Sequence, residues 1–318
     1  MQNFKVSIVV PVYKEEDSII PFLERAEKIA IKEMWDYEII FCLDPSPDKT
    51  YEVIKNQIER NPHIKLLYLS RKFGQPAATM AGIYNCIGDI CIVIDVDLQD
   101  PPELIPEMIK KWQKGFNVVY AKRKSRKGEA LLKKMVSYFG YKIIHSLTNV
   151  KIPRDTGDFR LIDRTVIEAL RTLKETHGFL RGLVAYVGYK QAFVEYERDA
   201  RKFGKGNYNK YIGSLKIGLN GLICFSSKPL QVIAITGVII AIIGFLLGIW
   251  YIIQKLILGI ELTPGLSTTV VVVTFFSGIQ LLSLGVIGEY IGRIYDEVKG
   301  RPMYFIAENS NQKKFEDK

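Results

Sequence analysis

The chain has few of the residues that build disulfide frameworks or thiolate metal sites. Its 318 residues include four cysteines and three histidines, with no CxxC pair and no histidine at metal-site spacing. Such a pattern fits a reducing compartment, in which thiols are buried as small side chains rather than paired. We therefore expect neither a disulfide nor a metal site at Cys42, Cys86, Cys91 and Cys224.

The glycine-rich loops that usually hold phosphate groups are also missing. Neither GxGxxG nor GxxxxGK[ST] occurs in the chain. This absence argues against the dinucleotide fingerprint and the P-loop. If the protein binds a phosphorylated ligand, a metal ion must therefore do the work of those backbone cradles.

Charged residues are absent from two long stretches near the C-terminus. None lies between Lys228 and Lys255, and none lies between Glu261 and Glu289. Each gap exceeds the ~18 apolar residues that mark a bilayer span. No small-residue cleavage site follows the first apolar run, so no secretory signal peptide is expected. The sequence predicts two spans in the inner (plasma) membrane, with the soluble domain and both termini cytoplasmic.

These gaps divide the chain into four parts. We expect a cytoplasmic soluble domain, a juxtamembrane amphipathic segment, a two-helix transmembrane hairpin and a cytoplasmic C-terminal tail, over residues 1–210, 211–228, 229–294 and 295–318. Within the second part, residues 211–225 place apolar side chains at helical spacing, which suits a helix in the membrane interface. A buried helix of the soluble domain is the alternative.

Short β-branched runs alternate with amphipathic stretches in the first half of the chain. This pattern predicts an α/β fold with a mainly parallel, Rossmann-like sheet. The runs are residues 6–10, 38–42, 64–69, 90–94 and 118–120. Ligands of such sheets bind beyond the carboxyl ends of the strands. Because polar residues follow each of the first four runs, we expect them to meet in one crevice.

An acidic pair follows the fourth of these runs. Asp95 and Asp97 are two residues apart, so a strand would direct both carboxylates to the same face. Two adjacent carboxylates suit Mg²⁺ or Mn²⁺, which prefer oxygen ligands and are commonly shared with a diphosphate. The ion would act as a Lewis acid on a leaving diphosphate. The alternative is that these residues cap a helix that begins near Pro101 and Pro102.

The net charge of +10 points to an anionic partner. Basic residues cluster at 122–127, 133–134 and 198–216, the last close to the first apolar stretch. For a membrane-tethered chain, an anionic lipid surface or a phosphorylated substrate fits this charge better than nucleic acid does. Nucleic acid would explain neither the acidic crevice nor the two spans. The alternative is that the basic residues form a solvated face.

Several motifs occur together in a specific order. The segments VVPVYKEEDSI, CLDPSPDKT, RKFGQPAATMAG and VIDVDLQDPPELI resemble family 2 glycosyltransferases with a GT-A fold. The segments TGDFRLIDR, GLICFSSKPL and GEYIGRIYDEVKGRP look like the branch that contains dolichol-phosphate mannose synthases and bactoprenol glucosyltransferases. The resemblance covers nearly the whole chain.

The resemblance implies a nucleotide-sugar site beside a metal site. It assigns Pro11, Tyr13, Glu15 and Asp44 to the nucleoside, Asp95 as a bridge to the metal, and Asp97 and Gln99 as metal ligands. Tyr13 can stack on a base, and Gln99 can offer a carbonyl oxygen to Mg²⁺ or Mn²⁺. The alternatives are that Tyr13 belongs to the core and that Glu15 is an ordinary acid at the start of a helix.

Arginines are the family's usual diphosphate ligands. Arg123 and Arg201 match these positions, and a guanidinium fork suits phosphate oxygens. Residues expected to help at the lipid phosphate are Arg126, Arg198 and Lys205. The chain departs from the family at Gly206-Asn207-Tyr208, where Ser-Lys-Tyr usually follows the glycine, and at Pro45, where glycine is usual. The family lysine's phosphate contact therefore has no matching residue here.

The position of the family's catalytic base is occupied by Asp158, which we favour over Asp155. A phosphate monoester has a second pKa near ~6, so a phosphate acceptor is largely a dianion at neutral pH and needs little deprotonation. Asp158 could therefore act as the base or could orient the acceptor. A helix N-cap before Leu161 is the structural alternative.

The resemblance implies an inverting transferase that moves a hexose to undecaprenyl phosphate at the cytoplasmic membrane face. UDP-glucose is the first choice of donor, ahead of GDP-mannose and UDP-linked amino sugars. A processive polysaccharide synthase would need a QxxRW motif and more spans, whereas a nucleotide-sugar-binding protein without activity should lose Asp95, Asp97 or Asp158. GxxxG spacings at Gly244 and Gly288 predict close packing within one hairpin or between subunits, and the resemblance suggests a homo-oligomer, such as a tetramer.

Overall fold

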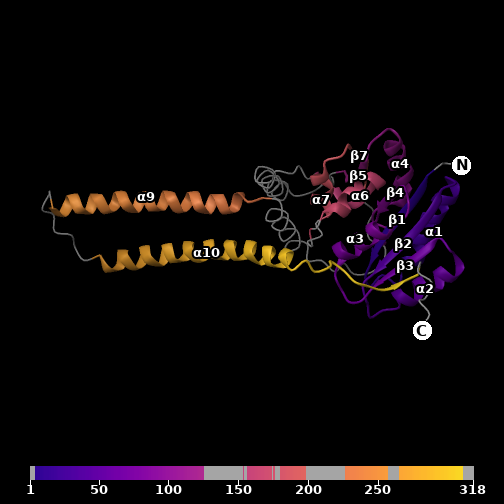
Figure 1. The fold of residues 1–318 in the computed structure, drawn as a ribbon, viewed down its shortest axis with the longest axis horizontal. Helices are drawn as coiled ribbons and strands as arrows, with labels where there is room; N and C mark the ends of the chain where they lie inside the picture. Colours follow the sequence, from indigo (N-terminus) through magenta and orange to yellow (C-terminus); the bar gives the residue numbers. More distant parts are fainter. Residues whose placement is uncertain are drawn as a thin grey trace. The chain divides into compact units, whose positions relative to one another are not determined.

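The computed structural model describes residues 4–124, 153, 156–173, 175, 180–197, 226–256 and 265–310. The chain divides into two compact units (Figure 1), which are described separately. The first comprises residues 1–142, 150–213 and 300–318, and the second comprises residues 143–149 and 214–299.

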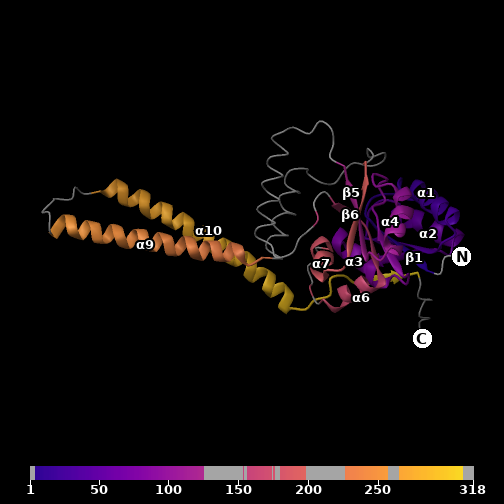
Figure 2. The same cartoon turned by 90° about the horizontal axis from the view of Figure 1, so that it is seen from above.

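An eight-stranded mixed sheet forms the centre of the first unit (Figure 2). The strand order is β7-β5-β6-β4-β1-β2-β3-β8, in which β4-β1-β2-β3 and β7-β5 are parallel, whereas β6 and β8 run antiparallel to their neighbours. The strands are β1 Lys5–Val12, β2 Asp36–Leu43, β3 Ile64–Leu69, β4 Ile90–Val93, β5 Val118–Arg123, β6 Thr156–Asp163, β7 Gln191–Tyr196 and β8 Ile306–Asn309.

The first five strands confirm the prediction from the β-branched runs. Seven of the eight residues of β1 are buried, as expected of parallel strands that are covered on both faces. The alternating helices supply that cover. In α1, the buried side chains recur at helical spacing, and Phe22 packs edge-on against Phe41 of β2 at 6.4 Å between ring centroids. Strands β6, β7 and β8 were not predicted.

The helices and the short 3-10 turn of this unit follow the strands in the expected alternation. They are α1 Ile19–Lys32, α2 Thr50–Arg60, α3 Gln75–Asn85, η1 Pro102–Leu104, α4 Ile105–Gln113, α6 Arg164–Thr172 and α7 Leu180–Val187. With β8, the chain after the last long helix returns to the edge of the sheet. Residues 306–309, within the expected C-terminal tail, are thus part of this unit.

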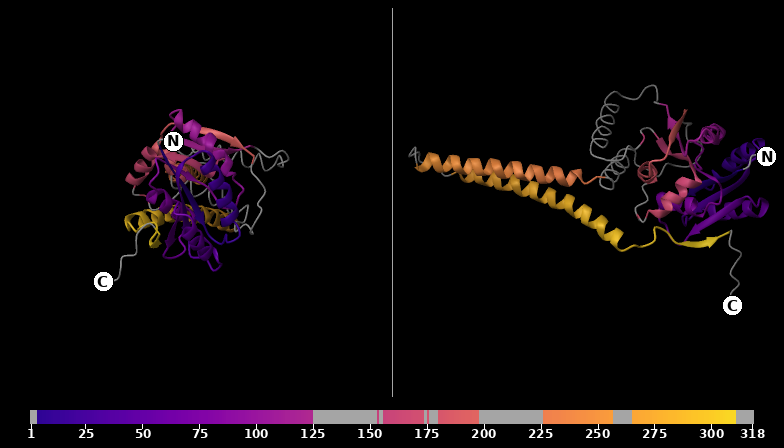
Figure 3. Two further views of the ribbon diagram at one scale, coloured as in Figure 1. Left: turned by 90° about the vertical axis from the view of Figure 1, so that its right-hand side faces the viewer. Right: turned by 45° about the horizontal axis from the view of Figure 1, so that its top comes forward.

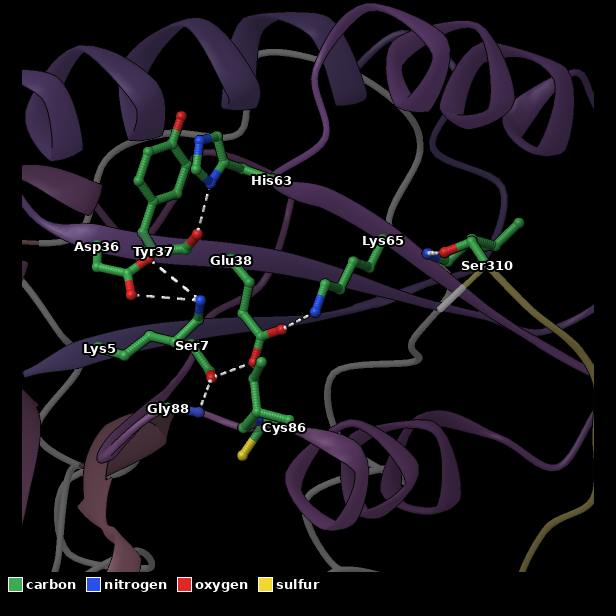
Figure 4. Close-up of polar contacts among 12 residues, drawn as sticks. Lys5, Ser7, Asp36, Tyr37, Glu38, His63, Lys65, Cys86, Gly88 and Ser310 are labelled. Atoms are coloured by element: carbon green, nitrogen blue, oxygen red, sulfur yellow. Dashed lines mark hydrogen bonds and ion pairs between the residues drawn. The ribbon is translucent and has the colours of Figure 1, made fainter. Parts of the chain in front are cut away.

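A closed polar network lies near the amino ends of β1, β2 and β3 (Figure 4). Glu38 is only 1% exposed. One carboxylate oxygen accepts from Ser7 Oγ at 2.5 Å, and the other pairs with the Lys65 ammonium. The backbone N–H of Gly88 donates to Ser7 Oγ at 2.8 Å. Because the carboxylate has an ammonium partner and hydrogen-bond donors, its burial is compensated.

His63 and the cysteines have structural roles in the described part of the chain. The His63 ring stacks on Tyr37 at 4.5 Å, and its Nδ1 lies 2.9 Å from the Tyr37 carbonyl oxygen (Figure 4). Cys42, Cys86 and Cys91 are buried and unpaired, as expected. Burial raises the pKa of the Cys42 thiol. Cys224, His145 and His177 lie outside the described residues.

The second unit contains two long apolar helices, α9 Lys228–Leu256 and α10 Leu266–Val298 (Figure 3). Lys228–Leu247 and Phe275–Val298 are long and apolar enough to cross a membrane, with mean hydropathies of 2.7 and 1.3. Neither stretch is buried in the protein, which distinguishes both from core helices of a soluble fold. A Cβ atom added at Gly244, Gly288 or Gly292 would meet no atom of the described residues within 4 Å.

Candidate active site

The acidic pair lies at the carboxyl end of β4, near the middle of the sheet. Strand β4 ends at Val93, and the next residues form a turn in which Leu98 has a φ of +58°. Side chains alternate in exposure along this turn: Asp95, Asp97 and Gln99 are partly exposed, whereas Val96, Leu98 and Asp100 are buried. Both carboxylates and Gln99 are thus partly accessible, although they lie in a turn and not in the strand that the spacing argument assumed.

The helix-capping alternative for this pair is wrong. The turn η1 begins after Pro101, and neither η1 nor α4 has a side-chain hydrogen bond at its N-cap. Asp95 instead accepts a hydrogen bond from Gln75 Nε2 at 2.8 Å, at the start of α3. Asp97 Oδ1 accepts from the backbone N–H of Gln99 at 3.1 Å. These contacts hold the segment in the turn.

The oxygen atoms of this turn suit a hard divalent cation. Mg²⁺ and Mn²⁺ are typically held by one or two carboxylates while substrate phosphates and water complete the shell. Asp95, Asp97 and Gln99 offer two carboxylates and an amide oxygen from partly exposed positions. Within the described ranges, no group of three or more His, Cys, Asp or Glu residues could hold a metal. Two carboxylates and an amide oxygen fit an ion whose other ligands are substrate phosphates and water.

The segments after β1 and β2 are joined by hydrogen bonds. The backbone N–H of Glu15 donates to Thr50 Oγ1 at 3.1 Å, and its carboxylate accepts from Ser18 Oγ at 2.8 Å. Tyr13 is partly exposed rather than a core residue, and the Lys72 ammonium lies 3.5 Å from its ring centroid. A cation therefore covers the ring that was expected to stack on a base.

Asp44 follows β2 and is only 2% exposed. Its two carboxylate oxygens accept from the backbone N–H groups of Phe73 and Gly74, at 3.0 and 2.8 Å. Gly74 has a φ of +95°, which a residue with a Cβ atom adopts only with strain. Asp44 thus holds the turn between β3 and α3. Pro11 is buried within β1 opposite Cys42.

Asp158 lies in β6, which separates β4 from β5 in the sheet. The pairing runs from Ile90 opposite Asp163 to Val93 opposite Arg160. Asp95 follows Val93 by two residues and Asp158 precedes Arg160 by two, so both aspartates lie past the same end of this pairing. The N-cap alternative for Asp158 is wrong, because Asp163 caps α6 by accepting from Val166 N at 2.9 Å.

Guanidinium groups surround the Asp158 carboxylate, whose side chain is 31% exposed. Its Oδ1 lies 2.9 Å from Arg181 Nε on α7 and 3.3 Å from Nη2 of the fully buried Arg160. Burial alone would raise the pKa of this carboxyl, but Arg181, Arg160 and Arg123 together lower it below its usual value. Asp158 is therefore an anion at neutral pH and a weak proton acceptor.

Arg123, at the end of β5, also faces this group. Its Nη2 lies 3.7 Å from Asp100 Oδ2, and its Nε donates to the Tyr196 hydroxyl at 3.2 Å. The Tyr196 hydroxyl in turn donates to Asp100. A Cβ atom on Gly157 would lie 2.7 Å from Arg123 Nη2, so glycine at this position leaves room for the guanidinium next to Asp158.

The structure brings most of the sequence-predicted site residues to one edge of the sheet. The residues that lie outside the described ranges are Arg126, Arg198, Arg201 and Lys205, together with the amphipathic segment 211–225. Sequence reasoning missed Arg160 and Arg181. Arg160 follows Asp158 by two residues, which was a usable signal once the strand was known, whereas no sequence pattern points to Arg181.

Comparison with known proteins identifies the family. Residues 7–171, which contain the acidic turn and Asp158, match the model of glycosyl transferase family 2. The chain belongs to glycosyl transferase family 2. Residues 228–294 match a second model, the GtrB C-terminal hairpin. The protein is accordingly a glycosyltransferase, and its mixed sheet with intervening helices is the GT-A fold expected from the motifs.

Similar family members match over almost their whole length. The chain is 43% identical to the uncharacterized glycosyltransferase YkcC of Bacillus subtilis, over 97% of this chain and 95% of that protein. It is 39% identical to the SfII prophage-derived bactoprenol glucosyl transferase of Shigella flexneri, over 96% and 98% of the two chains. It is also 42% identical to an uncharacterized glycosyltransferase of Synechocystis, over 96% of each.

Proposed function

We propose that this glycosyltransferase moves glucose from UDP-glucose to undecaprenyl phosphate at the cytoplasmic face of the membrane, with inversion at the anomeric carbon. The observation that carries the proposal is that Asp95 and Asp158 both lie past the same end of the β4–β6 pairing. Asp95 is suited to a donor diphosphate with its metal ion. Asp158 lies among arginines that suit an anionic acceptor. The full-length similarity to bactoprenol glucosyl transferases supports this choice of substrates.

The reaction is a single displacement. A phosphate oxygen of the acceptor attacks the anomeric carbon, the new C–O bond forms, and the bond to the β-phosphate oxygen breaks. The nucleoside diphosphate leaves with the electron pair. No covalent enzyme intermediate is needed, because the acceptor phosphate is itself the nucleophile.

The leaving diphosphate requires compensation of its charge. Asp95, Asp97 and Gln99 would hold Mg²⁺ or Mn²⁺, which supplies Lewis-acid stabilisation of the departing oxygen. Arg123 lies at the end of β5, which β6 separates from β4, and offers a guanidinium fork that is held by Asp100. Its contacts with Asp100 and Tyr196 position it before the substrate binds.

Asp158 is proposed to orient the acceptor rather than to remove its proton. The surrounding arginines lower its pKa, which disfavours proton uptake. The acceptor phosphate has a second pKa near ~6 and is already largely a dianion at pH 7. The repulsion between that dianion and Asp158 is balanced by Arg160 and Arg181, so the cluster can fix the direction of attack.

The two apolar helices explain why such a transferase is bound to the membrane. The polyisoprenyl tail of the acceptor remains in the lipid, so its phosphate must be met at the interface. The first unit contributes both the chain before α9 and strand β8 after α10. A hairpin of two spans satisfies this connection and leaves both flanking segments on the cytoplasmic side. The open glycine faces of α9 and α10 favour contacts between subunits in a homo-oligomer.

The proposal is tested by supplying purified full-length protein in detergent with undecaprenyl phosphate and radiolabelled donors. We expect a labelled, organic-extractable product from UDP-glucose only when Mg²⁺ or Mn²⁺ is present. GDP-mannose and UDP-linked amino sugars are tested as alternative donors in parallel reactions. If one of them gives a lipid product and UDP-glucose does not, that sugar nucleotide is the donor instead. Nucleotide binding without any lipid product would show instead that the protein is a nucleotide-sugar-binding membrane protein.

A further inference from the structure

The segment that follows the second apolar helix, residues 304–310, contacts the loop beside the expected donor site. Strand β8 pairs antiparallel with β3, with Glu308 opposite Tyr68 and Asn309 opposite Leu67. Ser310 continues this pairing, because its N–H donates to the Leu66 carbonyl oxygen at 3.0 Å, and its Oγ accepts from Leu66 N at 2.8 Å (Figure 4). We call residues 304–310 the C-terminal segment.

Side chains anchor the C-terminal segment to both neighbouring helices. Glu308 accepts from the Tyr51 hydroxyl at 2.7 Å and pairs with the Lys55 ammonium, and both partners lie on α2. The Tyr304 hydroxyl accepts from Asn85 Nδ2 at 3.4 Å, at the end of α3. A four-residue strand held by backbone pairing alone is easily displaced, so these contacts indicate a defined position for the segment.

The contact with the donor side is made by Phe305. Its carbonyl oxygen accepts from Ser70 N at 2.9 Å, and its ring packs against Phe73 with centroids 6.3 Å apart. The Arg71 guanidinium lies 4.0 Å from the centroid of the Phe73 ring. Phe305 thus contacts the loop of residues 70–74, which we call the β3–α3 loop.

The β3–α3 loop connects Phe305 to the residues assigned to the nucleoside. Phe73 and Gly74 donate their backbone N–H groups to Asp44, and the Lys72 ammonium covers the Tyr13 ring. A nucleobase that stacks on Tyr13 must displace Lys72. The position of this loop therefore determines whether Tyr13 is accessible.

Exposure sets Phe305 apart from a core aromatic. The residue is 55% exposed, yet its ring packs on Phe73 and its backbone is bonded to Ser70. Because much of the Phe305 side chain remains exposed, its packing stabilises the fold little. The main effect of its contacts is to hold the β3–α3 loop in position. This loop, in turn, is bound to Asp44, so the effect should appear in donor binding more than in stability.

We propose that the C-terminal segment contributes to the donor site. In this proposal, Phe305 is a positioning residue: it holds the β3–α3 loop, and the loop positions the nucleotide sugar. This inference rests on the proposed donor site at Tyr13 and Asp44. The residues that follow the membrane hairpin thus complete the binding site formed by the first strands of the chain.

The test compares Phe305→Ala, Phe305→Leu and the matched control Ala307→Ser in the full-length protein. Ala307 lies in the same strand with an exposed side chain and no described contact with the loop. Loss of an aromatic pair corresponds to about a three- to tenfold increase in the KM for UDP-glucose in Phe305→Ala. We expect kcat and the KM for undecaprenyl phosphate to change less than about twofold, with partial recovery in Phe305→Leu.

The affinity of the same variants for UDP, measured by calorimetry without acceptor, separates this inference from the transfer reaction. Weaker UDP binding in Phe305→Ala supports the inference even if no glycolipid is formed by the wild type. Equal UDP affinity and equal donor KM in a folded Phe305→Ala would overturn it. If Phe305→Ala does not fold, the same two quantities in Phe305→Leu decide the matter.

Discussion

Two carboxylates at opposite ends of the same sheet show how similar residues come to have different roles. Glu38, toward the amino ends of the strands, is 1% exposed and is enclosed by Ser7, Lys65 and the backbone of Gly88. Asp158, at the edge where β4 and β5 end, is 31% exposed and pairs with Arg160 and Arg181. The Glu38 carboxylate is buried by its partners, whereas the Asp158 carboxylate is kept ionised by its arginines and remains accessible.

The comparison teaches that charge pairing alone does not mark an active site. Both carboxylates have cationic partners, and both are partly or fully desolvated. Only Asp158 lies past the same end of the β4–β6 pairing as a second acidic group, Asp95. The predictions below separate a carboxylate that stabilises the fold from those that act on substrate.

The largest effect on turnover is expected from Asp97→Ala. Removal of one metal-binding carboxylate should cost several kcal/mol of transition-state stabilisation, equivalent to about a 10³-fold loss of kcat/KM. The melting temperature should remain that of the wild type, because Asp97 is partly exposed. Asp36→Ala is the matched control, since Asp36 is an exposed aspartate that pairs with Lys5 at the other end of β1 and β2. Comparable turnover in the two variants would contradict the metal assignment.

Glu38→Ala should instead lower stability. The substitution leaves the Lys65 ammonium without its partner in a largely buried site, and breaking a buried pair costs about 3 kcal/mol or more. We expect a lower melting temperature but a kcat per folded molecule within about twofold of the wild type. The measurement is thermal unfolding in detergent beside the transfer assay. A stable Glu38→Ala that has lost its activity would remove the contrast between the two ends of the sheet.

Asp158→Asn is expected to lower kcat by about 10²-fold, because an amide no longer balances Arg160 and Arg181 in orienting the acceptor. The acid limb of the rate, which the acceptor phosphate sets near pH ~6, should persist in this variant. Its persistence would be seen in a pH profile from pH 5 to 8. Disappearance of that limb in Asp158→Asn would show that Asp158 is the titrating base.

Arg181→Gln should have a smaller effect, which depends on pH. The charged groups that act on the Asp158 carboxylate are Arg181, Arg160 and Arg123. Burial raises the pKa of Asp158, so loss of Arg181 moves that pKa upward. In the wild type the lowered pKa keeps the carboxylate ionised until the pH falls below the ordinary aspartate range, and its contribution is lost only there. In Arg181→Gln, we expect this loss at higher pH, with a loss of kcat that is smaller than in Asp158→Asn and largest at the acid end of the pH profile.

Arg181→Lys is the control for that shift, because an ammonium restores the charge without the guanidinium geometry. It should return the pH profile toward that of the wild type. An identical acid limb in Arg181→Gln and the wild type would contradict the role of Arg181.

Local patterns allowed the first five strands and the acidic turn to be predicted. The β-branched runs predicted strands β1 to β5, and the acidic residues after the fourth run pointed to the turn that follows β4. Long-range contacts could not be predicted in this way. Arg181 reaches Asp158 from 23 positions along the chain, by the packing of α7 near β6.

Strand β8 was missed for a related reason. Its sequence IAEN has one large apolar residue and no alternation, so it has little intrinsic preference for a strand. It forms because the exposed edge of β3 offers backbone partners and because Glu308 meets Tyr51 and Lys55. The strand that carries Asp158 was recognisable only from its pairing with β4 and β5.

The most direct test of the central claim is the anomeric configuration of the lipid product, measured by NMR after reaction of full-length protein with UDP-glucose and undecaprenyl phosphate. UDP-glucose carries an α-linked sugar, so a single displacement on this edge of the sheet predicts a β-linked glucosyl phosphate. An α-linked product, or no lipid-linked glucose at all, would contradict the account.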